Sequence, residues 1–161
     1  MDRSTVAVIV PVYQDPDGVA ATLNSLLAQD TDHPFRIHVV DNDSTDRAPE
    51  VVRTYVDDYD PITSRRDTDV QSSYAARNTG IEHADADVFA FLDADVTVPT
   101  DWLDTALEAM EATDADYLGC AVDLDLPNRP TLAARFDQQT GVPSASTSNT
   151  GTSFSLQLVA K

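Results

Sequence analysis

The chain has 161 residues, a hydrophobic fraction of 42% and a formal net charge of -18. This length suits one domain around a single core, and the apolar content excludes a disordered protein. With 28 acidic against 10 basic residues and no basic cluster, the chain is a poor candidate for a nucleic-acid-binding protein.

The kind of acidic residue also carries information. The acidic residues are 24 aspartates and 4 glutamates, and Lys161 is the only lysine. Short hydrated carboxylates keep a surface solvated in concentrated salt, where repulsion between charges is screened over short distances. We therefore expect a halophilic protein. The alternative is an ordinary acidic protein, which normally has more lysine and a more even ratio of aspartate to glutamate.

The N-terminal sequence MDRSTVAVIVPVY contains an apolar stretch that Pro11 interrupts early. It is too short for a signal peptide or a membrane span. We expect a cytoplasmic protein without a transmembrane segment, with peripheral attachment to a membrane as an option. Cys120 is the only cysteine, so it cannot form an intramolecular disulfide and is expected to be a small buried hydrophobic residue.

Four short apolar runs predict strands, and they lack the strict alternation of a half-exposed strand, as is typical of parallel strands covered on both faces. The runs are VAVIV at 6–10, IHVV at 37–40, VFAFL at 88–92 and YLGCAV at 117–122.

Segments with helical spacing lie between these runs. The predicted helices start after an Asp15 cap with Pro16 at the first position, after Pro49, at Ser73 (ending at His83), and after a Thr100 cap. Strands that alternate with helices predict a doubly wound, mainly parallel α/β sheet with helices on both faces and right-handed connections.

The segment 138–161, QQTGVPSASTSNTGTSFSLQLVAK, has no acidic residue and many serines and threonines. Such a break in composition indicates a linker, a tail or a change of reading frame near residue 142. We therefore predict one domain at 1–137 and a divergent Ser/Thr-rich tail at 138–161.

In doubly wound sheets, ligands bind beyond the carboxyl ends of the strands. This rule places three polar loops, 11–15, 41–46 and 93–95, at one edge of the sheet. No G-x-G-x-x-G follows the first strand and no Walker loop occurs among the 5 glycines, which argues against dinucleotide oxidoreductases and P-loop NTPases.

The third loop contains the sequence DAD, with Asp93 and Asp95 directly after a strand predicted to be buried. Two rigidly held carboxylates can bind a hard divalent cation whose other ligands are water and phosphate oxygens. The alternative is an acidic loop that occurs by chance, because an aspartate-rich chain contains several such pairs.

Four segments in this order resemble the family 2 glycosyltransferases, which have the GT-A fold: VAVIVPVYQDP, HVVDNDSTD, SSYAARNTGIEHADADVFAFLDAD and DWLDTALEAM. The similarity covers residues 5–125, so the chain resembles the donor-binding N-terminal part of such an enzyme in truncated form. The resemblance implies a UDP-, TDP- or GDP-sugar as donor, Mn²⁺ or Mg²⁺ as cofactor, and a lipid-linked compound or a glycan as acceptor.

The resemblance also implies roles for residues near the nucleoside. Pro11 and Tyr13 would line the nucleobase pocket, with Tyr13 stacked on the base, although Tyr13 could instead close the core at the strand end. Asp15, Asp41 and Asn42 would complete this part of the site. The family usually has an acid where Asn42 stands, and an amide oxygen can still accept the hydrogen bond from the base.

For the diphosphate and the cation, the resemblance implies that Arg77 lies near the phosphates, although an ion pair with a neighbouring aspartate is the alternative. Asp93 would meet the ribose or the metal, with Ala94 beside the nucleotide sugar, and Asp95 would coordinate the metal.

The second half of related enzymes, which carries the acceptor site and a general base, has no counterpart after Asp125. The alternative to a glycosyltransferase is therefore a non-catalytic nucleotide-sugar-binding module. A nucleotidyltransferase would require a glycine-rich loop after the first strand, and PVYQDPDG does not supply it.

Overall fold

A computed structural model of the chain describes residues 4–120 and 156–160. These residues contain a six-stranded sheet with the strand order β3-β2-β1-β4-β6-β5. Four strands pair in parallel at one side of the sheet: β1 (Val6–Val12), β2 (Phe35–Asp41), β3 (Ile62–Arg66) and β4 (Val88–Leu92). The predicted mainly parallel α/β architecture is confirmed.

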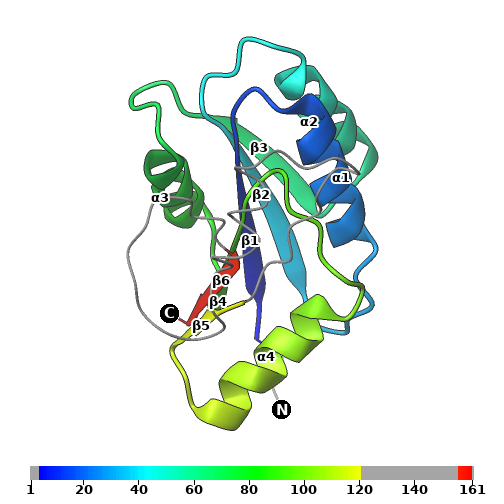
Figure 1. Cartoon of the computed structure of the whole chain (residues 1–161), viewed down its shortest axis with the longest axis vertical. Helices are drawn as coiled ribbons and strands as arrows, with labels where there is room; N and C mark the ends of the chain where they lie inside the picture. The colour runs from blue at the N-terminus through cyan, green and yellow to red at the C-terminus, as the bar shows by residue number, and fades with distance from the viewer. Residues whose placement is uncertain (1–3, 121–155, 161) are drawn as a thin grey trace, which may run out of the picture.

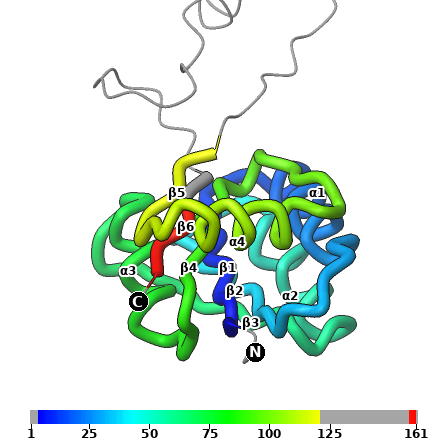
Figure 2. The backbone as a smooth tube through the Cα atoms, turned by 90° about the horizontal axis from the view of Figure 1, so that it is seen from below, coloured from blue at the N-terminus to red at the C-terminus, as the bar shows by residue number. Residues whose placement is uncertain are grey.

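The other side of the sheet is antiparallel. Strand β6 (Leu156–Ala160) lies between β4 and β5 (Tyr117–Gly119) and runs antiparallel to both. Figure 2 shows β6, in red, beside β4. The segment set apart as a tail at 138–161 thus contributes a strand to the central sheet, and neither β6 nor β3 was among the predicted strands.

Helices cover both faces of the sheet (Figure 1). Helices α1 (Pro16–Leu27), α2 (Ala48–Asp58) and α4 (Trp102–Thr113) share one hydrophobic cluster with the sheet. Helix α3 (Ser73–His83) packs on the opposite face, and its bounds agree with the predicted helix.

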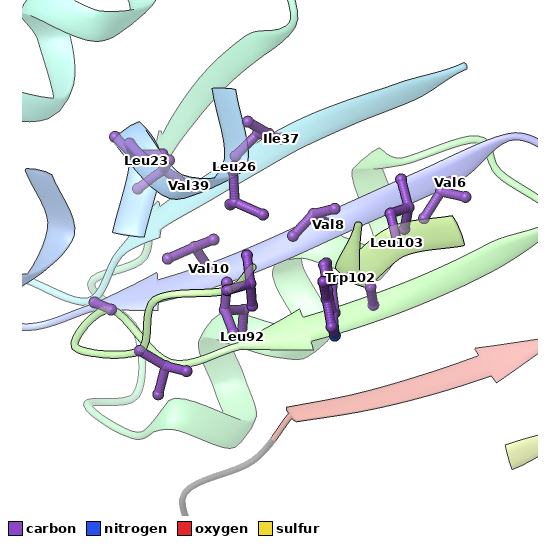
Figure 3. Close-up of a cluster of buried hydrophobic side chains, with 14 of the residues drawn as sticks. Val6, Val8, Val10, Leu23, Leu26, Ile37, Val39, Leu92, Trp102 and Leu103 are labelled. Atoms are coloured by element: carbon purple, nitrogen blue, oxygen red, sulfur yellow. The ribbon is translucent and has the colours of Figure 1, made fainter. Parts of the chain in front are cut away.

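Alternation along β1 explains how one strand serves both faces. Val6, Val8 and Val10 enter the larger cluster, where Figure 3 shows Val6 near Leu103 of α4, whereas Ile9 belongs to the smaller cluster on the α3 face. Burial on both faces is the reason why β1 lacks a polar alternation.

Helix α3 lies unusually close to β1. A Cβ atom built on Gly80 would stand 2.5 Å from Cγ2 of Ile9, so only glycine permits this approach without a shift. The approach brings the first turn of α3 toward the carboxyl ends of β1 and β4.

Two helix caps agree with elementary capping rules. The side chain of Asp15 accepts a hydrogen bond from the Gly18 N–H at 2.8 Å, as predicted, and that of Ser72 accepts one from the Ala75 N–H at 3.1 Å. The predicted Thr100 cap is wrong, because Asp101 occupies the N-cap position of α4 and makes no side-chain capping bond.

Two further expectations concern single features. Cys120 is half-buried rather than fully buried, and it packs at the margin of the larger cluster. Among the described helices, none is both long and apolar enough to cross a bilayer.

Candidate functional site

A cleft of about 320 Å³ opens at the carboxyl ends of β1, β2 and β4. It brings together most of the residues predicted for the site, from three strand ends and one helix; these are Pro11, Tyr13, Asp15, Asn42, Arg77, Asp93, Ala94 and Asp95. Val12, Ser73 and Tyr74 also line the cleft and were not predicted.

The backbone at two strand ends has a special conformation. Gln14, after β1, and Asp43, after β2, have φ values of 50° and 65°, in the left-handed region that non-glycine residues rarely adopt. The Gln14 N–H donates to Oγ of Ser44 at 3.0 Å, so the two turns support each other. This contact fixes the backbone next to Tyr13 and Asn42, which directly precede Gln14 and Asp43.

Asn42 is 3% exposed and its orientation is set by neighbouring backbone. Its Nδ2 donates to the carbonyl oxygen of Val70 at 3.0 Å and to that of Asp67 at 3.4 Å. An amide nitrogen has two hydrogens, and both are directed at these carbonyls. The amide oxygen is therefore the atom of Asn42 that can accept a hydrogen bond from a molecule in the cleft.

Asp41 does not line the cleft. Its buried carboxylate accepts a hydrogen bond from the Ser44 N–H at 3.1 Å and lies 3.6 Å from Nε of Arg66. These contacts hold the turn after β2 and so position Asn42. Direct contact of Asp41 with a nucleotide stays a prediction.

The DAD loop is fastened to helix α1 by a buried hydroxyl. Oγ1 of Thr22, on a residue with 0% exposure, lies 2.8 Å from the carbonyl oxygen of Ala94 and 2.9 Å from that of Val96. A further hydrogen bond joins the Val96 N–H to the Asp93 carbonyl at 3.1 Å. The two carboxylates of the loop are thus presented by a rigid turn, and Thr22 is a positioning residue that the sequence analysis missed.

Arg77 and Asp93 form an ion pair inside the cleft. Nη2 of Arg77 donates to Oδ1 of Asp93 at 2.7 Å, and the two side chains are only 14% and 20% exposed. An ion pair of Arg77 with a neighbouring aspartate was the predicted alternative to a phosphate contact. The pair joins α3 to the end of β4.

Tyr74 lies one helical turn before Arg77 and is 71% exposed. The guanidinium carbon of Arg77 stands 5.7 Å from the centre of the Tyr74 ring, within the range of a cation–π contact. A spacing of three residues on a helix places two side chains on the same face. That spacing is the signal by which Tyr74 could have been predicted from SSYAARN.

The local electrostatics are dominated by carboxylates. Partial burial raises the pKa of Asp95 above its ordinary value, and the negative charges of Asp93 and Asp15 raise it further, against a lowering by a backbone hydrogen bond. Because Asp93 and Asp15 make ionisation of Asp95 less favourable, a cation bound beside these three carboxylates would be stabilised.

Comparisons with known proteins agree with this geometry. Residues 7–139 match the family model of glycosyl transferase family 2. The glycosyltransferase AglE of Haloferax volcanii is 35% identical over 138 residues, which cover 85% of this chain and 45% of AglE. An uncharacterized glycosyltransferase of Escherichia coli, YibD, is 30% identical over 118 residues, or 73% of this chain and 34% of YibD.

Solved structures show the same fold. A mannosyltransferase from Pyrobaculum calidifontis, in complex with GDP-Man and Mn²⁺, has a TM-score of 0.68 at 28% identity, over 75% of this chain and 36% of that one. TarS of S. aureus has a TM-score of 0.63 at 25% identity, over 80% of this chain and 38% of that one. The chain spans less than half the length of these relatives, and it belongs to glycosyl transferase family 2.

Proposed function

We propose that the cleft binds the nucleotide-diphospho-sugar donor of a glycosyl transfer reaction, together with Mn²⁺ or Mg²⁺. The observation that carries this proposal is the convergence of an exposed aromatic ring, an amide oxygen, a guanidinium and two carboxylates on one cleft. The mannosyltransferase that shares this fold was solved with GDP-Man and Mn²⁺, which supports both halves of the proposal.

The nucleoside end of the donor fits the side of the cleft formed by Pro11, Tyr13 and Asn42. Tyr13 is 46% exposed, so its ring is available for stacking on a base. The Asn42 oxygen accepts a hydrogen bond, which suits the ring N–H of uracil, thymine or guanine and does not suit cytosine, whose ring nitrogen is itself an acceptor. We therefore propose a UDP-, TDP- or GDP-sugar.

The carboxylates fit a divalent cation that the substrate shares. Among the described residues, no group of three or more His, Cys, Asp or Glu side chains is arranged to hold a metal by itself. Asp95 and Asp93 supply hard oxygen atoms, and Mg²⁺ in particular is usually bound by one or two carboxylates plus phosphate oxygens and water. When bound, such a cation stabilises negative charge on the departing nucleoside diphosphate.

The remaining residues bind and orient the donor. Arg77, on α3, contacts Asp93 just after the end of β4, and a guanidinium there offers charged hydrogen bonds to phosphate oxygens. Asp93 and Ala94 lie beside it, where Asp93 can accept a hydrogen bond from a ribose hydroxyl. The acceptor, a glycan or a lipid-linked saccharide, is proposed from the family resemblance.

The experiment is calorimetric titration in molar potassium chloride with UDP, GDP and TDP in the presence of Mn²⁺. We expect binding of at least one diphosphate, and we expect Asp95→Ala to weaken it about tenfold or more, because a metal carboxylate is lost. Asp57→Ala, on the exposed face of α2, is the matched control. Equal affinities of the parent and Asp95→Ala would refute the metal assignment.

A second candidate is a donor-binding module that does not transfer sugar. Transfer requires a base beside the acceptor, and each carboxylate of the cleft already has another role. Asp15 caps α1, Asp93 pairs with Arg77, and Asp95 is the proposed metal ligand. None of the three is thus assigned to the acceptor. Release of nucleotide from a donor sugar without transfer to any saccharide would support this candidate, and efficient transfer by the chain would contradict it.

A further inference from the structure

The ion pair between Arg77 and Asp93 joins two groups for which the proposed function gives different ligands. In the proposed function the Arg77 guanidinium binds the diphosphate, and the Asp93 carboxylate binds the cation together with Asp95. In the structure they contact each other at 2.7 Å, with little solvent access. Tyr74 supports the guanidinium from a second direction through its ring.

This contact has an electrostatic consequence for each ligand alone. A cation that approaches Asp93 and Asp95 meets the positive charge of Arg77, which already neutralises one carboxylate. A diphosphate that approaches Arg77 must compete with Asp93 and is repelled by the carboxylates of Asp93, Asp95 and Asp15, which line the same cleft. If both ligands are bound, the guanidinium of Arg77 can contact the phosphates, because the cation can replace it as the positive partner of Asp93.

We propose that Arg77 is a coupling residue, whose guanidinium contacts either Asp93 or the diphosphate and thereby makes cation and nucleotide bind cooperatively. The inference rests on the proposed function, since it presupposes that the cleft takes both ligands. Thermodynamic linkage requires that the coupling be reciprocal: the factor by which Mn²⁺ raises the affinity for UDP equals the factor by which UDP raises the affinity for Mn²⁺.

A purely structural ion pair would behave differently. If Arg77 only fastened α3 to the end of β4, its removal would loosen the site and weaken both ligands. Coupling predicts opposite signs. Without the guanidinium, Mn²⁺ alone binds more tightly because the positive charge beside Asp93 is removed, and UDP alone binds more weakly because a phosphate contact is lost. The signs of two affinities therefore separate the two roles.

The test measures Mn²⁺ alone by electron paramagnetic resonance and UDP or GDP alone by calorimetry, both in molar potassium chloride. Arg77→Met should raise the affinity for Mn²⁺ and lower that for the diphosphate, each about fivefold or more, the lower end of typical coupling factors. Asp93→Asn should give the reverse signs, since it removes a cation ligand and also the negative charge that competes with the phosphates for the guanidinium. This second variant keeps the test decisive if Arg77→Met does not fold.

Arg53→Met is the matched control. Arg53 also lies among carboxylates, those of Glu50, Asp57 and Asp58 on α2, outside the cleft. It should leave both affinities unchanged, because molar salt screens charges beyond about 3 Å. Weaker binding of both ligands in Arg77→Met, or no change in Mn²⁺ affinity, would overturn the coupling role while leaving the proposed function intact. Absence of any Mn²⁺ or diphosphate binding by the parent would overturn both.

Discussion

At the scale of single residues, the raised pKa of Asp95 links the stability and the proposed metal binding of the protein to pH in opposite directions. The folded protein holds the proton of Asp95 at a pH where the unfolded chain has released it. Between the two pKa values the native state binds more protons, so the free energy of unfolding falls as pH rises through this interval. The proposed metal binding needs the ionised carboxylate, so the affinity for the cation should rise over the same interval.

We therefore predict that Asp95→Asn raises the melting temperature of the cation-free protein at neutral pH. The difference from the parent should vanish below the ordinary pKa of aspartate, where both side chains are neutral. In the same variant Mn²⁺ affinity should be weak and should lose the pH dependence that Asp95 contributes. Thermal unfolding across a pH series measures the first effect, and an equal melting temperature of parent and variant at neutral pH would contradict it.

The site residues show what sequence patterns could and could not predict. The position of Tyr13, Asn42 and Asp95 at one edge was predicted because the strand ends of a parallel sheet meet there, and their roles were predicted from the family resemblance. Asp41 was placed at the same edge, yet its carboxylate faces the Ser44 N–H, since a side chain at a strand end can satisfy its own turn. Thr22 gave no signal, because a threonine within a helix is ordinary until its long-range partner is known.

At the scale of elements, Thr22 joins helix α1 to the DAD loop. Thr22→Val keeps the shape of the side chain and removes the hydroxyl, leaving the buried carbonyls of Ala94 and Val96 without this donor. We predict a loss of about 1–3 kcal/mol in the free energy of unfolding and weaker Mn²⁺ binding. Denaturant unfolding and Mn²⁺ titration measure both. Thr54→Val, whose hydroxyl is at the exposed surface of α2, is the control and should change neither.

The packing of α3 on β1 allows a second prediction. Gly80→Ala should destabilise the protein by about 1–2 kcal/mol, because overpacking costs about 1–3 kcal/mol and the helix propensity of alanine returns at most about 1 kcal/mol. Combination with Ile9→Ala should be less than additive, since the added methyl then has room. Glu82→Ala, exposed on the same helix, is the control. A variant Gly80→Ala more stable than the parent would show that the helix shifts without cost.

Most strands were predictable because buried strands appear in the sequence as runs of apolar residues. Helix α3 was predicted with its observed bounds although only Ala76 and Gly80 of the helix are buried, and the Ser72 side chain caps its start. Strand β3 was missed because only Ile62 of its five residues is buried, so ITSRR has no apolar run. Strand β6 was missed because its surroundings lack acidic residues, and that contrast in composition masked the short LQLVA pattern.

At the scale of the whole molecule, the net charge of -18 opposes compaction. Repulsion between surface carboxylates extends over about 10 Å in 0.1 M salt and about 3 Å in 1 M salt. We predict that the melting temperature rises between low and molar potassium chloride, as a halophilic protein requires. Sucrose at matched osmolarity is the control, because it changes hydration without screening. A melting temperature independent of potassium chloride would contradict halophilic adaptation.

The position of β6 also bears on how the protein is synthesised. Strand β4, which presents Asp93 and Asp95, is covered at one edge by β1 and at the other by residues 156–160. The ribosome synthesises the strands from β1 through β4 long before β6. Until β6 is made, one edge of β4 is unpaired in the growing chain, and such an edge can pair with other nascent chains. The strand that precedes the proposed metal ligands thus has both of its edges paired only after residue 160 has left the exit tunnel.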